Sequence, residues 1–155
     1  MLKVCITGTT RGLGKSLAEH FISKGCEVIE LNRADDKIRS AIGCDLYINN
    51  AYDDALQLNL FNRLYVSVNK MIVMGSVAAD YPDPDMPLYS HYKKELKTRV
   101  LEIANKKLKG KADILLLELT GASYNDPELI KRTIDFWLDN PKITCVSFVH
   151  GDPNG

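Results

Sequence analysis

Short apolar runs alternate with longer amphipathic stretches along nearly the whole sequence. A short apolar run bounded by turn residues is typical of a buried strand, and an amphipathic stretch after it is typical of a helix that covers the sheet. The apolar runs cover residues 3–7, 27–31, 45–49, 70–76, 112–119 and 143–149. Because strands separated by helices pair in parallel, this pattern predicts a doubly wound α/β fold.

The stretches between the runs are mostly long enough for a helix. The predicted helices cover residues 12–24, 54–68, 88–109 and 126–138. Gly25 and Gly110 are the expected stops of the first and third. The second run and the third are separated by residues 32–44, and the short segment 34–43 within them has room for one helical stretch but not for a helix-strand-helix unit. The expected spatial order of the strands is therefore 2-1-3-4-5-6.

Length and composition are those of one ordinary globular domain. The chain has 155 residues, 45% hydrophobic and 26% charged, so we expect residues 1–155 to share one core. Lys plus Arg and Asp plus Glu both number 20, which argues against nucleic acid or a membrane surface as a partner. The cysteines lie far apart, and no apolar segment has the length of a leader or a membrane span. These features predict a cytoplasmic protein without a metal site.

A glycine-rich loop over residues 7–14 joins the first apolar run to the first predicted helix. Backbone amides at a helix start suit an anionic phosphate, and glycines allow a pyrophosphate to approach closely. The position of the loop between strand and helix favours dinucleotide binding over a tight turn that happens to hold three glycines. The residues expected to contact the cofactor here are Gly8, Thr10, Arg11, Gly12, Leu13 and Gly14.

The spacing of these glycines resembles the short-chain dehydrogenase/reductase family, and further motifs similar to that family's follow in order. They are Asn49-Asn50-Ala51, Gly75-Ser76, Tyr89 with Lys93, and Thr120-Gly121. Each of them comes at the end of a predicted strand or at the helix after it. The resemblance implies a Rossmann-like domain that binds NAD(P) and transfers a hydride to or from a small carbonyl or alcohol. It adds Asn50, Ala51, Lys93, Thr120 and Gly121 to the expected cofactor contacts.

The sequence departs from the family pattern in the half that would hold the cofactor. Tyr52 stands where the third-strand motif has glycine, and Thr120 stands where the family usually has proline. The family's threonine that contacts the nicotinamide amide has no clear equivalent, and Ser123 is the nearest hydroxyl. The short segment after Arg33 lacks the helix, edge strand and helix that the family fits there, so the cofactor half is expected to be trimmed.

A tyrosine and a lysine supply the acid–base chemistry that hydride transfer needs. Hydride addition to a carbonyl leaves charge on oxygen, so a proton donor must stand beside it. Tyr89 is the expected general acid/base, because Lys93 lies four residues later on the same helix face and its ammonium favours the phenolate. Ser76 is expected to bond the substrate oxygen. By resemblance, Lys93 also holds the nicotinamide ribose, and Asn59 is the expected proton-relay asparagine. A chance pair on the helix surface is the alternative, and the order of the motifs argues against it.

The end of the second apolar run indicates which cofactor is preferred. Dehydrogenases that select NAD usually carry an acid there for the ribose 2′-hydroxyl, whereas this chain has Asn32 followed by Arg33. Arg33 and Arg11 are expected to hold a 2′-phosphate, which favours NADP(H) over NAD(H). In the alternative, Glu30 is the ribose acid and Arg33 is solvated; strand alternation argues against it.

More than one function agrees with these motifs. An NADP(H)-dependent oxidoreductase acting on a small molecule agrees best with Ser76, Tyr89 and Lys93. A cofactor-binding sensor without turnover is the alternative, because the cofactor half is trimmed. A sugar-nucleotide epimerase agrees less well, since the chain has no room for the substrate domain of that class.

Two expectations concern the surface. Residues 80–87, rich in Pro and Asp, predict a loop beside the substrate site, and its acids disfavour a strongly anionic substrate unless they face only water. A homo-oligomer is expected, because the apolar residues of the third helix exceed what one sheet face is expected to cover. These residues are Leu96, Val100, Leu101 and Ile103.

Overall fold

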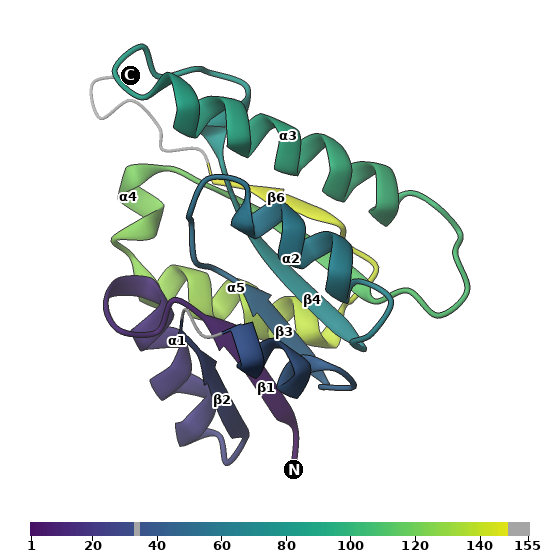
Figure 1. Ribbon diagram of the computed structural model, residues 1–155. Coiled ribbons are helices and arrows are strands. Elements are labelled where there is room, and N and C mark those ends of the chain that lie inside the picture. The colour runs from purple at the N-terminus through teal and green to yellow at the C-terminus, as the bar shows by residue number, and fades with distance from the viewer. Residues whose placement is uncertain (33–34, 149–155) are drawn as a thin grey trace.

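A six-stranded parallel sheet runs through the molecule in the order β2-β1-β3-β4-β5-β6 (Figure 1). The computed structural model describes residues 1–32 and 35–148, and the sheet lies within them. The strands are β1 Lys3–Thr7, β2 Glu27–Leu31, β3 Leu46–Asn49, β4 Lys70–Ser76, β5 Asp113–Leu119 and β6 Cys145–Ser147. The predicted order is confirmed, and no seventh strand lies beyond β2 in the described part of the chain.

Helices connect the strands. They are α1 Gly12–Ser23, α2 Leu56–Leu64, α3 Pro87–Ala104, α4 Gly121–Tyr124 and α5 Pro127–Asp139. Two short 3-10 helices, η1 Asp35–Ala41 and η2 Val77–Ala79, complete the connections. The helical stretch expected within 34–43 is thus η1, whereas the sequence patterns did not predict α4.

Both faces of the sheet are covered, as a doubly wound fold requires. The helices α2 and α3 lie together on one face, and α1 and α5 contact each other on the opposite face (Figure 1). One buried cluster, which includes Phe61, Met71 and Val100, fills the layer beneath α2 and α3. A second, which includes Leu17, Ile134 and Trp137, fills the layer beneath α1 and α5. The central strands read as nearly continuous apolar runs because both of their faces are buried.

The long helix α3 ends earlier than its sequence suggests. The expected stop was Gly110, but the last helical residue is Ala104, and residues 105–110 are exposed. Another turn would have no sheet to cover, and Lys111 instead donates to the carbonyl of Ala104 at 2.9 Å. Gly110, with φ of 77°, makes the turn that leads into β5.

The apolar residues of α3 are covered by the chain itself. Leu96, Val100 and Ile103 are at most 2% exposed, and Leu101 packs against the same cluster. The apolar face on which the expectation of a homo-oligomer rested is therefore part of the core of one chain.

The edge strand β2 has a different character from the central strands. In the described residues it pairs with β1 alone, so one side of its backbone has no partner strand. Glu27 and Glu30 are exposed on it, and Val28 and Ile29 are half-buried.

No helix in the described residues is both long and apolar enough to cross a membrane.

The carboxyl ends of the strands place the motif residues along one edge of the sheet. The chain reverses its direction of winding between β1 and β3, which makes their carboxyl ends the switch point where ligands of such sheets bind. The loop after β1, the motif after β3, Ser76 at the end of β4 and Thr120 after β5 all lie along this edge.

The start of α5 provides a test of the fold's local energetics. Asp126 caps the helix by accepting a hydrogen bond from the amide of Leu129 at 3.2 Å, and Pro127 takes the first helical position. Asp126→Ala should lower the free energy of unfolding in urea by about 1 kcal/mol, and Asp126→Asn should retain most of it. Equal unfolding free energies for Asp126→Ala and the unmodified protein would contradict this capping role.

Candidate active site

The glycine loop and α1 approach each other too closely for side chains. A Cβ at Gly14 would lie 1.9 Å from the carbonyl oxygen of Gly8 and 2.6 Å from Nδ2 of Asn50. Gly8 and Gly12 have φ of 72° and 61°, a region that side chains disfavour. All three glycines are therefore required by the backbone, and α1 begins directly above the end of β1.

Asn50 and Ala51, which follow β3, hold this loop in place. The side chain of Asn50 donates to the carbonyls of Thr7 and Gly8, each at 3.2 Å. The hydroxyl of Thr7 accepts from the amides of Asn50 and Ala51, each at 3.0 Å. The motif after β3 thus shapes the loop itself, in addition to any contact with a ligand.

Asn32, which follows β2, fixes the loop from its other side. Its side-chain oxygen accepts from the amide and from the hydroxyl of Thr9, each at 3.2 Å. Thr9 is 3% exposed and Asn32 is half-buried, so this contact is partly shielded from water. Arg33, the next expected cofactor contact, lies outside the described residues. The alternative acid, Glu30, is exposed on the edge strand.

The first turn of α1 is open to an anion. Arg11 precedes the helix and is exposed, as is Thr10. Among the described residues no side chain caps α1, and its first turn contains no acid. The side chain of Leu13 is buried in the core, so only its backbone amide can serve a ligand. Unpaired amides at a helix start, beside glycines, fit a phosphate group.

A buried lysine is the centre of the candidate site. Lys93 is 4% exposed, and its Nζ donates to Oε1 of Gln57 and to the carbonyl of Met74, each at 2.8 Å. The same Nζ lies 5.6 Å from the centre of the Tyr89 ring and 5.4 Å from that of Tyr52. Burial lowers the pKa of Lys93 to about 7. The lysine amine is thus held in place, and with this pKa it gains or loses its proton near neutral pH.

Tyr89 and Tyr52 lie edge to face above this lysine. Their ring centres are 4.8 Å apart and their planes make an angle of 67°. The hydroxyl of Tyr52 donates to Asp54 at 3.3 Å. The pKa of Tyr52 is raised, mainly by its partial burial and secondly by the negative charge of Asp54. Among the described residues no hydrogen bond joins Nζ of Lys93 to the Tyr89 hydroxyl, so the contact between the expected pair runs through the ring face.

The hydroxyl residues at the ends of β4 and β5 have structural partners. Ser76 is 8% exposed, and its oxygen accepts from the amide of Ala78 at 3.1 Å, which starts η2. Thr120 caps α4 through a reciprocal pair of bonds with Ser123. Ser123 is fully buried and its hydroxyl already bonds Thr120, so it is not placed to contact a nicotinamide. Gly121 has open space beside its Cα.

The structure brings Gln57 rather than Asn59 to the lysine. Asn59 is exposed on the outer side of α2, whereas Gln57 is 2% exposed. A signal for Gln57 exists in the sequence, because it shares the helix face of the buried residues Leu60, Phe61 and Leu64. A lone polar residue on an otherwise apolar face is a candidate for a specific partner.

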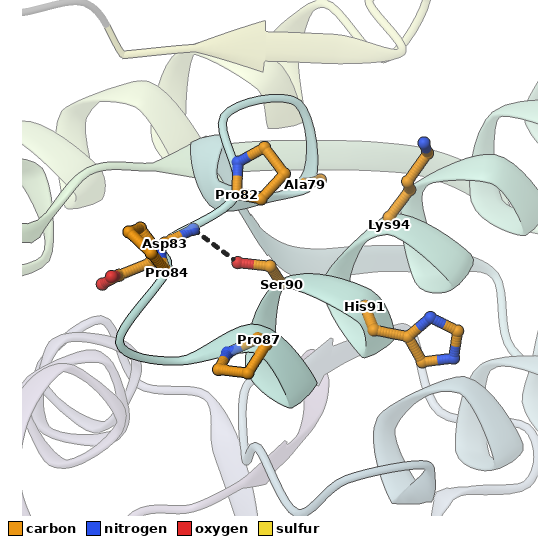
Figure 2. A pocket seen from close by; sticks show the side chains of 8 residues that line it. All are labelled: Ala79, Pro82, Asp83, Pro84, Pro87, Ser90, His91 and Lys94. Atoms are coloured by element: carbon orange, nitrogen blue, oxygen red, sulfur yellow. Dashed lines mark hydrogen bonds between the residues drawn. The ribbon is translucent and has the colours of Figure 1, made fainter.

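The hollow shown in Figure 2 is separate from this site. It has a volume of about 390 Å³ and is lined by Ala79, Pro82, Asp83, Pro84, Pro87, Ser90, His91 and Lys94. On α3, Ser90 follows Tyr89 and Lys94 follows Lys93, each by about 100° around the helix, and His91 lies nearly half a turn from both Tyr89 and Lys93. The hydroxyl of Ser90 accepts from the amide of Asp83 at 3.0 Å, which fastens the loop of residues 80–87 to α3.

Known proteins that resemble this chain are found by structure rather than by sequence. No family model matches the sequence, and no curated protein matches it. Solved structures do match. Serine dehydrogenase from Escherichia coli has a TM-score of 0.73 at 16% identity over 95% of this chain and 97% of that one. The chain has the fold of the short-chain dehydrogenases.

Two further structures share the fold. 3-ketoacyl-(acyl-carrier-protein) reductase from Brucella melitensis, complexed with NADH, has a TM-score of 0.71 at 13% identity over 94% of this chain and 96% of that one. 4-hydroxyisoleucine dehydrogenase, complexed with NADH and succinate, has a TM-score of 0.80 at 14% identity over 98% of this chain and 100% of that one. At such identities the likeness concerns the fold alone.

The glycine loop offers a direct test of the geometry. Gly14→Ala should lower the free energy of unfolding by at least about 3 kcal/mol, the upper end for overpacked positions, because its Cβ would meet backbone. Gly121→Ala is the matched control, since a Cβ there meets nothing within 4 Å. Urea unfolding of both variants measures the difference, and equal effects would show that α1 can move away from Gly8.

Proposed function

We propose that this protein is an NAD(P)-dependent oxidoreductase that transfers a hydride between NADP(H) and a small carbonyl or alcohol. The observation that carries the proposal is the amine of Lys93, buried beneath the Tyr89 ring at the sheet edge where the glycine loop begins α1. A buried lysine with only neutral hydrogen-bond acceptors is unfavourable for folding unless it has another purpose.

The residues at the edge fit a dinucleotide. Gly8, Gly12 and Gly14 add no side chains of their own to the loop, beside which the Tyr124 hydroxyl lies, 2.8 Å from where a Cβ of Gly12 would be. The first amides of α1 have no side-chain cap in the described part of the chain. In the proposed complex, the amides of this loop bind the pyrophosphate. Lys93 and the residues after β3 and β5, among them Asn50, Ala51, Thr120 and Gly121, border the nicotinamide half.

In the proposed reaction, proton transfer is the task of the protein. The bound cofactor supplies or accepts the hydride. Tyr89 gives its hydroxyl proton to the substrate oxygen during reduction and takes it back during oxidation. When Lys93 is protonated, its ammonium stabilises the phenolate form of Tyr89 that remains after the proton has been given up. Ser76 donates a hydrogen bond to the same substrate oxygen, which requires its hydroxyl proton to turn toward the substrate while its oxygen still caps η2.

The structural relatives support the cofactor class. Two of them are described as complexes with NADH, and both are a reductase or a dehydrogenase. The preference for NADP(H) rests on this chain's own residues. Asn32 is neutral and bonded to the loop, and Arg11 is exposed at the start of α1, where it is free to meet a 2′-phosphate.

A sensor that binds NADP(H) without turnover is the second candidate. The observation that favours it is Tyr52, whose ring contacts Tyr89 and lies over the Lys93 amine. A bulky ring at this position narrows the space beside the proton donor. Steady consumption of NADPH with a panel of ketones and aldehydes separates the two functions.

Tyr89→Phe tests the acid–base assignment. The change removes the hydroxyl and keeps the ring contacts, so NADPH binding should persist while turnover falls by roughly 10²–10⁴-fold, the usual contribution of general acid–base catalysis. Tyr92→Phe, on the same helix, is the matched control and should leave turnover unchanged. Steady-state kinetics and calorimetry measure the two properties. A Tyr89→Phe enzyme with the rate of the unmodified one would remove Tyr89 from the mechanism.

Arg11→Ala and Arg33→Ala test the cofactor preference. A charge-assisted bond to a phosphate contributes roughly 1.5–3 kcal/mol, so each change should weaken NADPH binding more than tenfold and leave NADH binding nearly unchanged. Arg63→Ala, exposed on α2, controls for the loss of one positive charge. Calorimetry with both cofactors is the measurement. Equal affinities of the unmodified protein for NADPH and NADH would end the case for NADP(H).

A further inference from the structure

One buried carboxamide joins four elements of the candidate site. Gln57 is the only glutamine in the sequence. Its Nε2 donates to the carbonyls of Asn49 at 2.9 Å and Met74 at 2.8 Å, and its Oε1 accepts from Lys93 at 2.8 Å. Its backbone carbonyl accepts from the side chain of Asn49 at 2.8 Å. Both ends of this side chain are therefore bonded, and its orientation is fixed.

These bonds determine where the lysine amine can lie. Oε1 of Gln57 and the carbonyl of Met74 hold Nζ at the end of β4, and the Met74 carbonyl accepts from Gln57 as well. The helix α2, which carries Gln57, packs against α3, which carries Lys93. Without the carboxamide, Nζ would keep one oxygen acceptor out of two.

The groups around the amine are neutral. On α3 the titratable neighbour is Tyr89, and on the segment after β3 it is Tyr52, whose hydroxyl bonds the exposed Asp54. The helix α2 presents Gln57, and β4 presents a backbone carbonyl. No carboxylate forms an ion pair with Lys93 among the described residues.

We propose that Gln57 is the positioning residue of this site: it holds the Lys93 amine under Tyr89 and, as a neutral acceptor, places no opposite charge beside that amine. The catalytic meaning of this role rests on the proposed function. The role itself does not, because the contacts join only residues of this chain.

The choice of an amide over a carboxylate has a clear electrostatic consequence. Burial favours the neutral amine and lowers the pKa of Lys93 to about 7. A carboxylate in place of Oε1 would favour the ammonium and raise that pKa, typically by about 1–3 units for an opposite charge at this separation. With glutamine, the amine changes charge near neutral pH; with glutamate, it would stay protonated there.

The test follows the Lys93 side chain in the full-length, cofactor-free protein by NMR of labelled lysine, with Lys93→Met identifying its signal. Gln57→Glu should raise the titration midpoint of Lys93 by about 1–3 pH units. Asn59→Asp is the matched control, because it adds the same charge two residues away on the exposed side of α2 and should leave the midpoint in place. A Lys93 midpoint that is the same in Gln57→Glu as in the unmodified protein would overturn the proposal.

A second measurement needs no variant at this position. Labelling of glutamine alone gives one side-chain amide group, that of Gln57. Its protons should exchange with water many times more slowly than those of an exposed asparagine, because both are directed at buried carbonyls. Exchange as fast as for an exposed amide would overturn the proposal even if Gln57→Glu does not fold. If Gln57→Glu raises the titration midpoint of Lys93 but the unmodified protein consumes no NADPH, the positioning role is supported. Only the proposed oxidoreductase function is then contradicted.

Discussion

The contact between the first turn of α1 and the carbonyl of Gly8 is the constraint on which the rest of the edge depends. Because position 14 has no side chain, the helix begins directly over the end of β1, and in the described residues no side chain caps its first amides. Asn50 bonds the same carbonyl, and this ties the end of β3 to the loop. The neighbouring β4 and β5 continue from β3, so the positions of Ser76 and Thr120 relative to the loop follow from this one approach.

The fold could be predicted in most respects from the sequence, because its determinants are local or short-range. Buried parallel strands read as apolar runs, and a connection of about ten residues excludes an extra strand. The ends of helices were harder to predict. The sequence from Asn105 to Lys109 is compatible with a helix, but no sheet lies beneath it, and only the tertiary structure shows this. The four-residue α4 is too short for any periodicity to reveal.

In the candidate site, too, local relations could be predicted from the sequence, whereas contacts between distant parts of the chain could not. Tyr89 and Lys93 could be placed on one face because both lie on one helix at a spacing of four residues. The partner of Lys93 comes from a different helix, and its identity depends on which face of α2 packs against α3. The predicted start at residue 54 lies two residues before the observed start at Leu56, where Asp54 adopts a positive φ of 44°. The role of Ser123 as a helix cap could not be predicted either, because it depends on α4, a helix that no sequence pattern indicates.

The short connection between β2 and β3 also affects how the molecule meets its neighbours. A strand with one unpaired side presents a row of amides and carbonyls to which another chain can add, and this is a common route to ordered aggregation. On β2 the exposed side chains near this row are the carboxylates of Glu27 and Glu30. An incoming strand would have to bring its backbone close to these charges and remove water from them. The acidic residues of β2 therefore oppose the addition of another strand at this edge of the sheet.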